Sequence, residues 1–129
     1  MSHANINANH VEFSVDTVGS AGSAAGSVEL EQGVSGAIAA INIALHASAP
    51  VTTVVTVKIS GDLFEETVLE VTNPTSTTIY RPLVTPQIND GTDISDLYIY
   101  YLLSDQKMTV EIASSDALTA AAVVIVTLL

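Results

Sequence analysis

The stretch that decides the fold is Val51-Thr-Thr-Val-Val-Thr-Val-Lys-Ile59, in which almost every residue is β-branched. Side chains of this type favour an extended backbone and pack well on the surface of a sheet. The stretch ends at Ser60-Gly61-Asp62, a composition typical of a turn. A second segment, Leu63 to Val71, mixes apolar side chains with glutamates and stops at Asn73-Pro74. The sequence therefore predicts a β-hairpin over residues 51–71.

Strand patterns also precede this hairpin. Val11 to Asp16 and Val28 to Glu31 alternate with a period of two, which indicates strands with one buried and one solvated face. The Ala-rich segment Ala37 to Leu45 allows a helix, because some of its apolar residues fall at helical spacing. The run Ile41-Asn-Ile-Ala-Leu-His46 nevertheless alternates strictly, and its isoleucines favour extended backbone. We therefore expect a strand rather than a helix here.

Two segments lack such patterns. Met1 to Asn9 is polar, with neither the basic start nor the apolar stretch of a signal peptide. Residues 19–27 read Gly-Ser-Ala-Gly-Ser-Ala-Ala-Gly-Ser, with little side chain to pack and much backbone freedom to lose on ordering. We expect a flexible N-terminal segment at 1–10 and a flexible loop at 19–27. Either segment could become ordered on docking to a partner.

The chain beyond the hairpin is equally rich in strand-forming residues. Thr77 to Thr85 is interrupted by Pro82, which places it at a sheet edge or in an extended connection. Leu97 to Leu103 is almost continuously apolar, so we expect a strand that is buried on both faces. Ser104-Asp105-Gln106 is predicted to turn the chain into a further strand that includes Met108 to Ile112.

These segments make eight or nine short strands, joined by turns and without a convincing amphipathic helix between them. Parallel sheets need long crossover connections, usually helices, so the pattern predicts an all-β, antiparallel fold. A two-sheet sandwich is the expected architecture, with a jelly roll preferred. An immunoglobulin-like sandwich is the second choice, weakened by the missing Cys, Trp, Cys pattern. We expect one such domain over residues 11–129.

The composition excludes several classes of function. Apolar residues make up 48% of the 129 residues and charged residues only 13%, which leads us to expect self-association. The formal net charge is -11, with three dispersed basic residues, too few for the basic patch that nucleic acids or anionic membranes require. There is no cysteine, so disulfides and thiol chemistry are excluded. The longest apolar tail, Leu118 to Leu129, is shorter than the roughly 20 residues of a membrane-spanning helix. We expect a soluble protein made in the cytoplasm.

Few residues suggest a chemical site. Asp90, Asp93 and Asp96 follow a turn and are a weak candidate for a calcium site, although they lack EF-hand spacing and also suit a solvated acidic turn. No pair of histidines has the short spacing of a metal site, and no nucleophile motif or phosphate loop occurs. The adjacent Glu65 and Glu66 would point to opposite faces of a strand, which does not suit glycosidic chemistry. We predict no catalytic residues, no cofactor and no enzymatic activity.

Several residues are candidates for a core or subunit contact. On an extended backbone Tyr98 and Tyr100 share one face while Tyr101 lies on the other, so they are expected to line the core and a subunit contact. A ligand-binding aromatic ladder is the alternative. The C-terminal run around Val124 and Val126 has little alternation, which indicates a central strand or one buried between subunits.

In size, composition and strand pattern, the last 80 or so residues resemble the small capsid decoration proteins, or cement proteins, of tailed bacteriophages. The resemblance lies in residues 51–71, in Asp90-Gly-Thr-Asp93 leading into Tyr98-Ile-Tyr-Tyr-Leu-Leu-Ser-Asp105, and in Thr109-Val-Glu-Ile-Ala113. It implies a non-enzymatic virion protein on the capsid exterior, forming homotrimers or similar oligomers that grip the major capsid protein. The alternative is a glycan- or receptor-binding module of a tail or fibre.

Overall fold

The computed structural model describes residues 1–129 as eleven β-strands without a helix. All pairings between strands are antiparallel, so the predicted all-β, antiparallel class is confirmed. The strands are β1 (His3–Asn7), β2 (His10–Val15), β3 (Ala24–Glu29), β4 (Val34–Leu45), β5 (Val54–Ser60), β6 (Glu65–Thr72), β7 (Ile79–Tyr80), β8 (Leu83–Val84), β9 (Ile99–Tyr100), β10 (Leu102–Ser115) and β11 (Ala122–Leu128).

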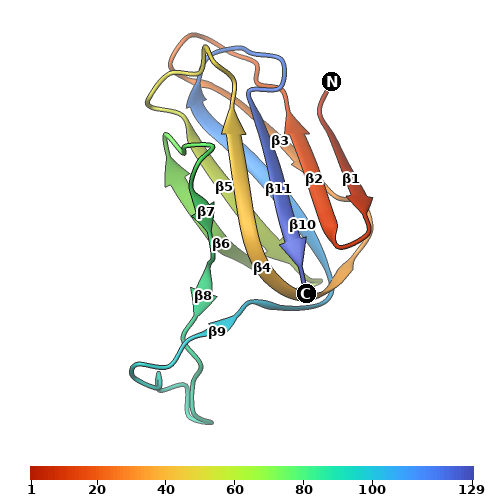
Figure 1. The fold of residues 1–129 in the computed structure, drawn as a ribbon, viewed down its shortest axis with the longest axis vertical. Coiled ribbons are helices and arrows are strands. Elements are labelled where there is room, and N and C mark those ends of the chain that lie inside the picture. Colours follow the sequence, from red (N-terminus) through yellow and green to blue (C-terminus); the bar gives the residue numbers. More distant parts are fainter.

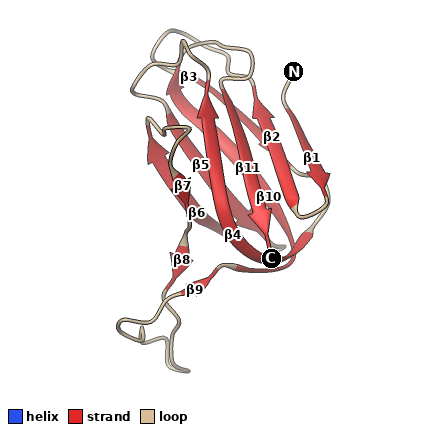
Figure 2. Ribbon diagram, viewed as in Figure 1, coloured by secondary structure: helices blue, strands red, loops and turns tan.

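Nine strands are joined by hydrogen bonds in the order β1-β2-β11-β4-β10-β5-β6, with β3 added to β10 and β7 added to β4. Strand β10 connects the two halves of this path, because its first residues pair with β4 and the rest pair with β5 and β3. Figure 1 shows β5 and β10 passing behind β4 and β11. The remaining two strands, β8 and β9, pair only with each other, away from the other strands (Figure 2).

Both halves of the path contribute to a single core of 20 buried residues. Strands β2, β4 and β11 supply one side of it, and β5 and β10 supply most of the other. Burial of a valine, isoleucine or phenylalanine stabilises a fold by roughly 1.5–3 kcal/mol each, so this core is the main source of stability. Its largest fully buried side chains are Phe13, Ile38, Ile41, Ile43, Met108 and Ile112.

The predicted hairpin is confirmed. Strands β5 and β6 pair from Val54↔Thr72 to Ser60↔Glu65, around a connection at residues 61–64. The Ala-rich segment forms strand β4 and not a helix, and its alternation buries Ile41 and Ile43 while Asn42 stays partly exposed.

The C-terminal strand lies where its composition suggested. Strand β11 pairs with β2 on one side and with β4 on the other, so it is a central strand. Val124 and Val126 are completely buried in the core, and Val123 and Ile125 between them are partly exposed on the opposite face.

The structure differs from the expectation of two unpaired flexible segments. Residues 3–7 form β1, which pairs with β2, and Ala24 to Glu29 form β3, which pairs with β10. Pairing of this kind uses backbone groups, which small side chains do not obstruct. Gly26 even requires the absence of a side chain, because a Cβ there would collide with the carbonyl oxygen of Asp16. Composition alone therefore did not reveal the strands that begin in these two segments, while residues 19–23 do lie in a connection.

The expectation for residues 97–106 was wrong in two respects. Leu97 to Leu103 is not a doubly buried strand: only β9 and the start of β10 are extended, and most of these side chains are exposed. Ser104-Asp105-Gln106 is not a turn between strands but lies within β10, where the register with β4 shifts between Leu103 and Gln106. Asp105 has a φ of 53° there, as expected for an irregularity that bends one strand of a pair.

Candidate functional site

The two ends of the molecule differ in construction. The registers place the connections at residues 16–23, 46–53, 73–78 and 116–121 at one end, which we call the loop end. The opposite end, which we call the arm end, carries the connections at residues 30–33 and 61–64 and the C-terminus. A long excursion, residues 81–102, projects from the arm end, and we call it the arm (Figure 1).

The arm is an ordered β-ribbon. Its strands β8 and β9 pair as Leu83↔Tyr100 and Val84↔Ile99, and a further bridge joins Gln87 to Asp93. A turn closes the tip, where the Ile88 N–H donates to the Thr92 carbonyl over 2.9 Å and the Gly91 N–H donates to the Ile88 carbonyl over 2.9 Å. The arm therefore holds a defined shape through its own backbone.

This shape is not held by a core. No residue from Arg81 to Leu102 is buried, although the arm is rich in apolar side chains. Proteins rarely expose contiguous apolar surface of this kind unless it forms an interaction site. The large apolar side chains that the arm exposes are Leu83, Ile88, Leu97, Tyr98, Ile99, Tyr100 and Leu102.

Part of the arm forms a surface groove, which we call the arm groove. It is lined by five apolar residues and one cation: Arg81, Leu83, Tyr98, Ile99, Tyr100 and Leu102. Tyr98 is 61% exposed and Leu102 is 69% exposed. A largely apolar groove with one placed charge is a typical binding surface, in which the charge selects the orientation of the bound group.

Arg81 is distinctive among the three basic side chains. Lys58 Nζ lies 3.2 Å from Glu65 Oε1 and 3.0 Å from Glu111 Oε2, and Lys107 Nζ lies 3.6 Å from Glu29 Oε1. Arg81 makes no ion pair or side-chain hydrogen bond, and it is exposed. In a chain with fourteen acidic residues, the one basic side chain without a partner thus lies in the arm groove.

The predicted contact residues separate into two groups. Tyr98 and Tyr100 line the arm groove and are not part of the core, so the expectation of a core position is wrong for them. Tyr101 is half-buried and packs against the core, and its burial, followed by the negative charge of Glu66, raises its pKa. Val124 lies in the core, as does Val126. The sequence therefore separated Tyr98 and Tyr100 from Tyr101 as predicted, but it did not predict that the first two are exposed.

The three candidate calcium ligands do not come together. No group of three or more His, Cys, Asp or Glu side chains is placed to hold a metal ion. Asp93 Oδ1 instead accepts a hydrogen bond from Gln87 Nε2 over 3.0 Å, and Asp90 Oδ1 accepts one from the Thr92 N–H over 2.9 Å. Hydrogen bonds from Thr92, first from its side chain and then from its backbone, lower the pKa of Asp90. Asp96 adopts a φ of 60°. These aspartates shape the arm.

The histidines are also dispersed. His10 Nδ1 lies 3.2 Å from Thr127 Oγ1, and His46 Nδ1 accepts a hydrogen bond from the Ser48 N–H over 3.0 Å. His3 Nδ1 lies 3.3 Å from the Met1 carbonyl oxygen. Each imidazole has a local partner, in a different part of the structure.

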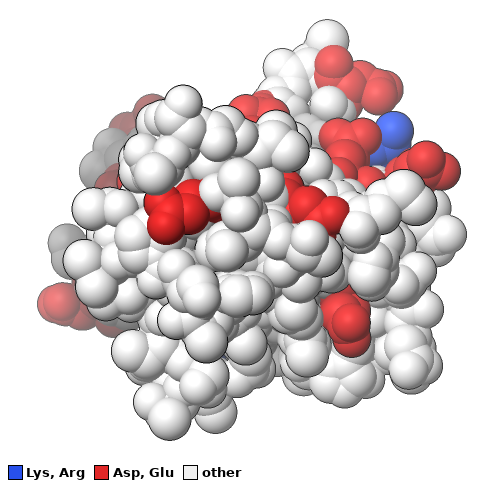
Figure 3. Space-filling view, turned by 90° about the horizontal axis from the view of Figure 1, so that it is seen from above, with Lys and Arg blue, Asp and Glu red and all other residues white.

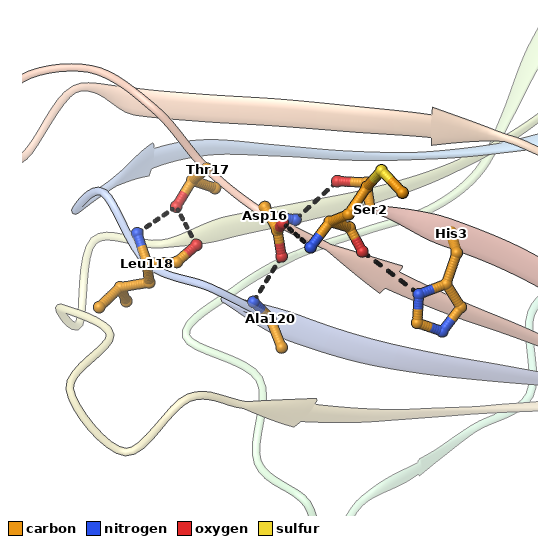
Figure 4. Close-up of polar contacts among 7 residues, drawn as sticks. Ser2, His3, Asp16, Thr17, Leu118 and Ala120 are labelled. Carbon is orange, nitrogen blue, oxygen red and sulfur yellow. Dashed lines mark hydrogen bonds and ion pairs between the residues drawn. The ribbon is translucent and has the colours of Figure 1, made fainter.

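A polar cluster at the loop end was missed by sequence reasoning (Figure 4). Asp16 Oδ1 accepts a hydrogen bond from the Ala120 N–H over 2.7 Å, and Asp16 Oδ2 lies 2.6 Å from the N-terminal ammonium group. The Leu118 N–H donates to Thr17 Oγ1 over 3.0 Å. The hydrogen bond from Ala120, followed by the one from the N-terminus, lowers the pKa of Asp16. Residues about a hundred positions apart meet here, so no local pattern could have revealed the cluster.

On the face seen from the loop end, charged side chains do not form one continuous patch (Figure 3). Viewed from the loop end, acidic side chains form separate groups on a largely uncharged surface, and the basic side chain in view lies among acidic ones (Figure 3). Acidic charge of this kind favours solubility and repels other copies except where apolar or basic groups intervene.

Comparison with known proteins found no similar protein. No family model matches the sequence, and neither a curated protein nor a solved structure matches it. The chain contains no helix, and therefore none that is long and apolar enough to cross a membrane.

Proposed function

We propose that this chain is a non-enzymatic structural protein that decorates and stabilises the outside of a tailed-phage capsid. The observation that carries the proposal is the arm: an ordered ribbon whose apolar side chains no part of its own chain covers. We infer that a neighbour, either another copy or the major capsid protein, covers this apolar surface. The resemblance to decoration proteins in composition and strand pattern supports this kind of assembly.

The strand order supports a specific sheet architecture. We infer a two-sheet jelly roll, in which the first of eight strands pairs with the last, the second with the seventh, and so on inward. Without β1, β8 and β9, the remaining eight strands pair in that order: β2 with β11, β3 with β10, β4 with β7, and β5 with β6. This order supports a jelly roll over an immunoglobulin-like sandwich. Jelly rolls are frequent in capsid proteins.

The charge distribution suits this role. A decoration protein has to stay soluble before assembly and adhere afterwards, which calls for an acidic exterior with a local apolar contact surface. The net charge of -11 provides the first property and the arm provides the second. We expect a homotrimer on the capsid exterior, with the major capsid protein as the second partner and with no role for nucleic acid or membrane.

Two measurements test the proposal. Light scattering on the purified protein gives its mass in solution, and sedimentation with undecorated phage shells gives its binding. We expect a stable oligomer, most simply a trimer, that sediments with the shells in a fixed ratio. A matched variant replaces residues 85–98 with a short glycine-serine turn, which removes the tip of the ribbon and leaves the core strands intact. It should fold but no longer sediment with shells. A variant that still binds shells at the same ratio would contradict the role given to the arm.

A glycan- or receptor-binding module is the second candidate, and the arm groove is the observation that favours it. Tyr98 and Tyr100 line this groove together with Arg81, and aromatic rings with a polar group nearby could bind a sugar. Jelly rolls also occur in lectins. Binding on a glycan array that is lost in Tyr98→Ala, combined with no affinity for shells, would favour this function over decoration.

A further inference from the structure

A second exposed apolar feature lies at the arm end, at the tip of the β5–β6 hairpin. Leu63 is 99% exposed and Phe64 is 50% exposed, although both are large apolar side chains. They are flanked by Asp62 and Glu66, two exposed carboxylates that make no ion pair and no hydrogen bond. We call residues 62–66 the hairpin tip. It is an exposed apolar knob at the end of the hairpin, with two carboxylates that have no partner.

The arm groove has the complementary properties. It is a hollow lined by Leu83, Ile99 and two tyrosines, and it contains the one basic side chain without a partner, Arg81. An apolar knob with spare carboxylates therefore matches an apolar groove with a spare guanidinium group. Charge complementarity of this kind orients an interface, and aromatic and arginine residues are the types that contribute most to binding energy.

The two surfaces do not satisfy each other within one molecule. Leu63 is almost completely exposed, and the groove residues Tyr98 and Leu102 are mostly exposed as well. Both surfaces nevertheless lie at the arm end, because the hairpin tip follows Ser60, which pairs with Lys107 of β10, and β10 begins at the base of the arm. Each molecule thus presents a knob and a groove at the same end.

We propose that the hairpin tip of one copy docks into the arm groove of a second copy, with Arg81 paired to Asp62 or Glu66 across the contact. A knob and a groove that are different patches form a heterologous contact, and repetition of this contact can close a ring. The proposal rests on the proposed function, since it names the surfaces through which copies of an oligomeric structural protein meet. Such a contact would let acidic copies associate despite their mutual repulsion, because it uses the one basic side chain without a partner.

Crosslinking tests the contact directly, because the chain has no cysteine of its own. Leu63→Cys is prepared in one tagged chain and Tyr100→Cys in another, the chains are mixed, and a short bismaleimide is added. The expected product is the mixed dimer. Val51→Cys, also an exposed apolar position at 72% but at the loop end, replaces Leu63→Cys as the control and should give little mixed product. Equal yields from the two mixtures would overturn the proposal.

Charge reversal tests the proposed ion pair between Arg81 and the carboxylates of the hairpin tip. Arg81→Glu should weaken self-association by at least about tenfold, measured by sedimentation velocity over a concentration series. The double variant Asp62→Lys with Glu66→Lys should be weakened similarly. A mixture of the two variants should recover association, since the charges are then exchanged across the contact. Recovery supports the contact, and a mixture that stays as weak as its components overturns it.

Measurements on the same samples distinguish the knob-and-groove contact from the decoration role. Wild-type protein that remains monomeric in solution but sediments with shells would overturn the knob-and-groove contact and leave the decoration role standing. Wild-type protein that associates through these residues but ignores shells would support the contact and overturn the decoration role. Chemical denaturation of each variant shows whether it is folded, so that a loss of association is not mistaken for unfolding.

Discussion

The loop end and the arm end of this molecule use their residues in opposite ways. At the loop end, short connections of small polar residues are tied together by hydrogen bonds between segments distant in sequence, such as Asp16 with Ala120 and Thr17 with Leu118. At the arm end, large apolar side chains project into solvent and the one unpaired basic side chain lies among them. The connections at the loop end are thus tied together within the chain, whereas the apolar side chains of the arm are not covered by their own chain. Substitutions at the two ends should therefore affect different properties.

The core between the two ends supports both, and it is where substitution should have the largest effect. Val124→Asp places a charge among completely buried side chains, and we expect a loss of more than about 4 kcal/mol in the free energy of unfolding. That loss is a large part of the total stability of a domain, so the variant should not form a soluble assembly. Ile125→Asp, on the opposite face of the same strand, is the matched control. Thermal melting monitored by circular dichroism distinguishes them, and equal melting temperatures would show that the strand is not central.

The next largest effect is expected at the loop end. Gly26→Val should lower the free energy of unfolding by about 1–3 kcal/mol, because a side chain there collides with the backbone of Asp16. Ser27→Val, an exposed neighbour in β3, should be almost neutral. Urea denaturation measures both. Equal stability of Gly26→Val and Ser27→Val would show that β3 does not lie this close to the backbone of residue 16.

Asp16 provides a smaller effect that depends on pH. Its pKa is lowered in the folded state from an ordinary value of 3.8, so the ionised side chain stabilises the fold. That contribution is fully present above pH 3.8 and is lost as the pH falls through the lowered pKa. Asp16→Asn should therefore be less stable than wild type at neutral pH, and the gap should narrow in acid. Asp62→Asn, which removes a carboxylate without a partner, is the control. A stability gap that stays constant down to pH 2 would contradict this account.

The smallest effect on folding is expected in the arm. Leu83→Ser combined with Tyr98→Ser should change the free energy of unfolding of the monomer by less than about 0.5 kcal/mol, because neither side chain is buried. Self-association should nevertheless be lost in sedimentation velocity. Val18→Ser, at an exposed apolar position of the loop end, should leave self-association intact. If the arm variant were strongly destabilised as a monomer, the arm would be part of the fold and not a contact surface.

Strands could be predicted from the sequence where their side chains form a β-branched or alternating apolar pattern. The β-branched run at 51–59 and the alternation around Ile41 gave the strands directly, since apolar side chains have to reach the core. It did less well where backbone pairing decided the structure. Strand β3 is made largely of alanine, glycine and serine, and its pairing with β10 depends on close approach rather than on apolar pattern.

The candidate site was likewise predicted only in part from the sequence. The tyrosines were predicted to be contact residues, and their apolar run was interpreted as a buried strand, whereas it belongs to an exposed arm. An apolar run has the same appearance whether its partner is its own core or another molecule. Arg81 was not singled out at all, because its importance lies in the absence of a carboxylate near it. Only the three-dimensional arrangement can show that absence.

The attachment of the arm also has a mechanical consequence. At its first end the arm continues from β7, a strand of two residues that pairs only with β4. At its second end it runs directly into β10, a strand of 14 residues that pairs with β3, β4 and β5. A pull on the arm tip should therefore detach β7 at low force, while the load on β10 is shared by many hydrogen bonds along its length. Single-molecule pulling from the arm tip should show these as two separate events, the first weak and reversible and the second strong.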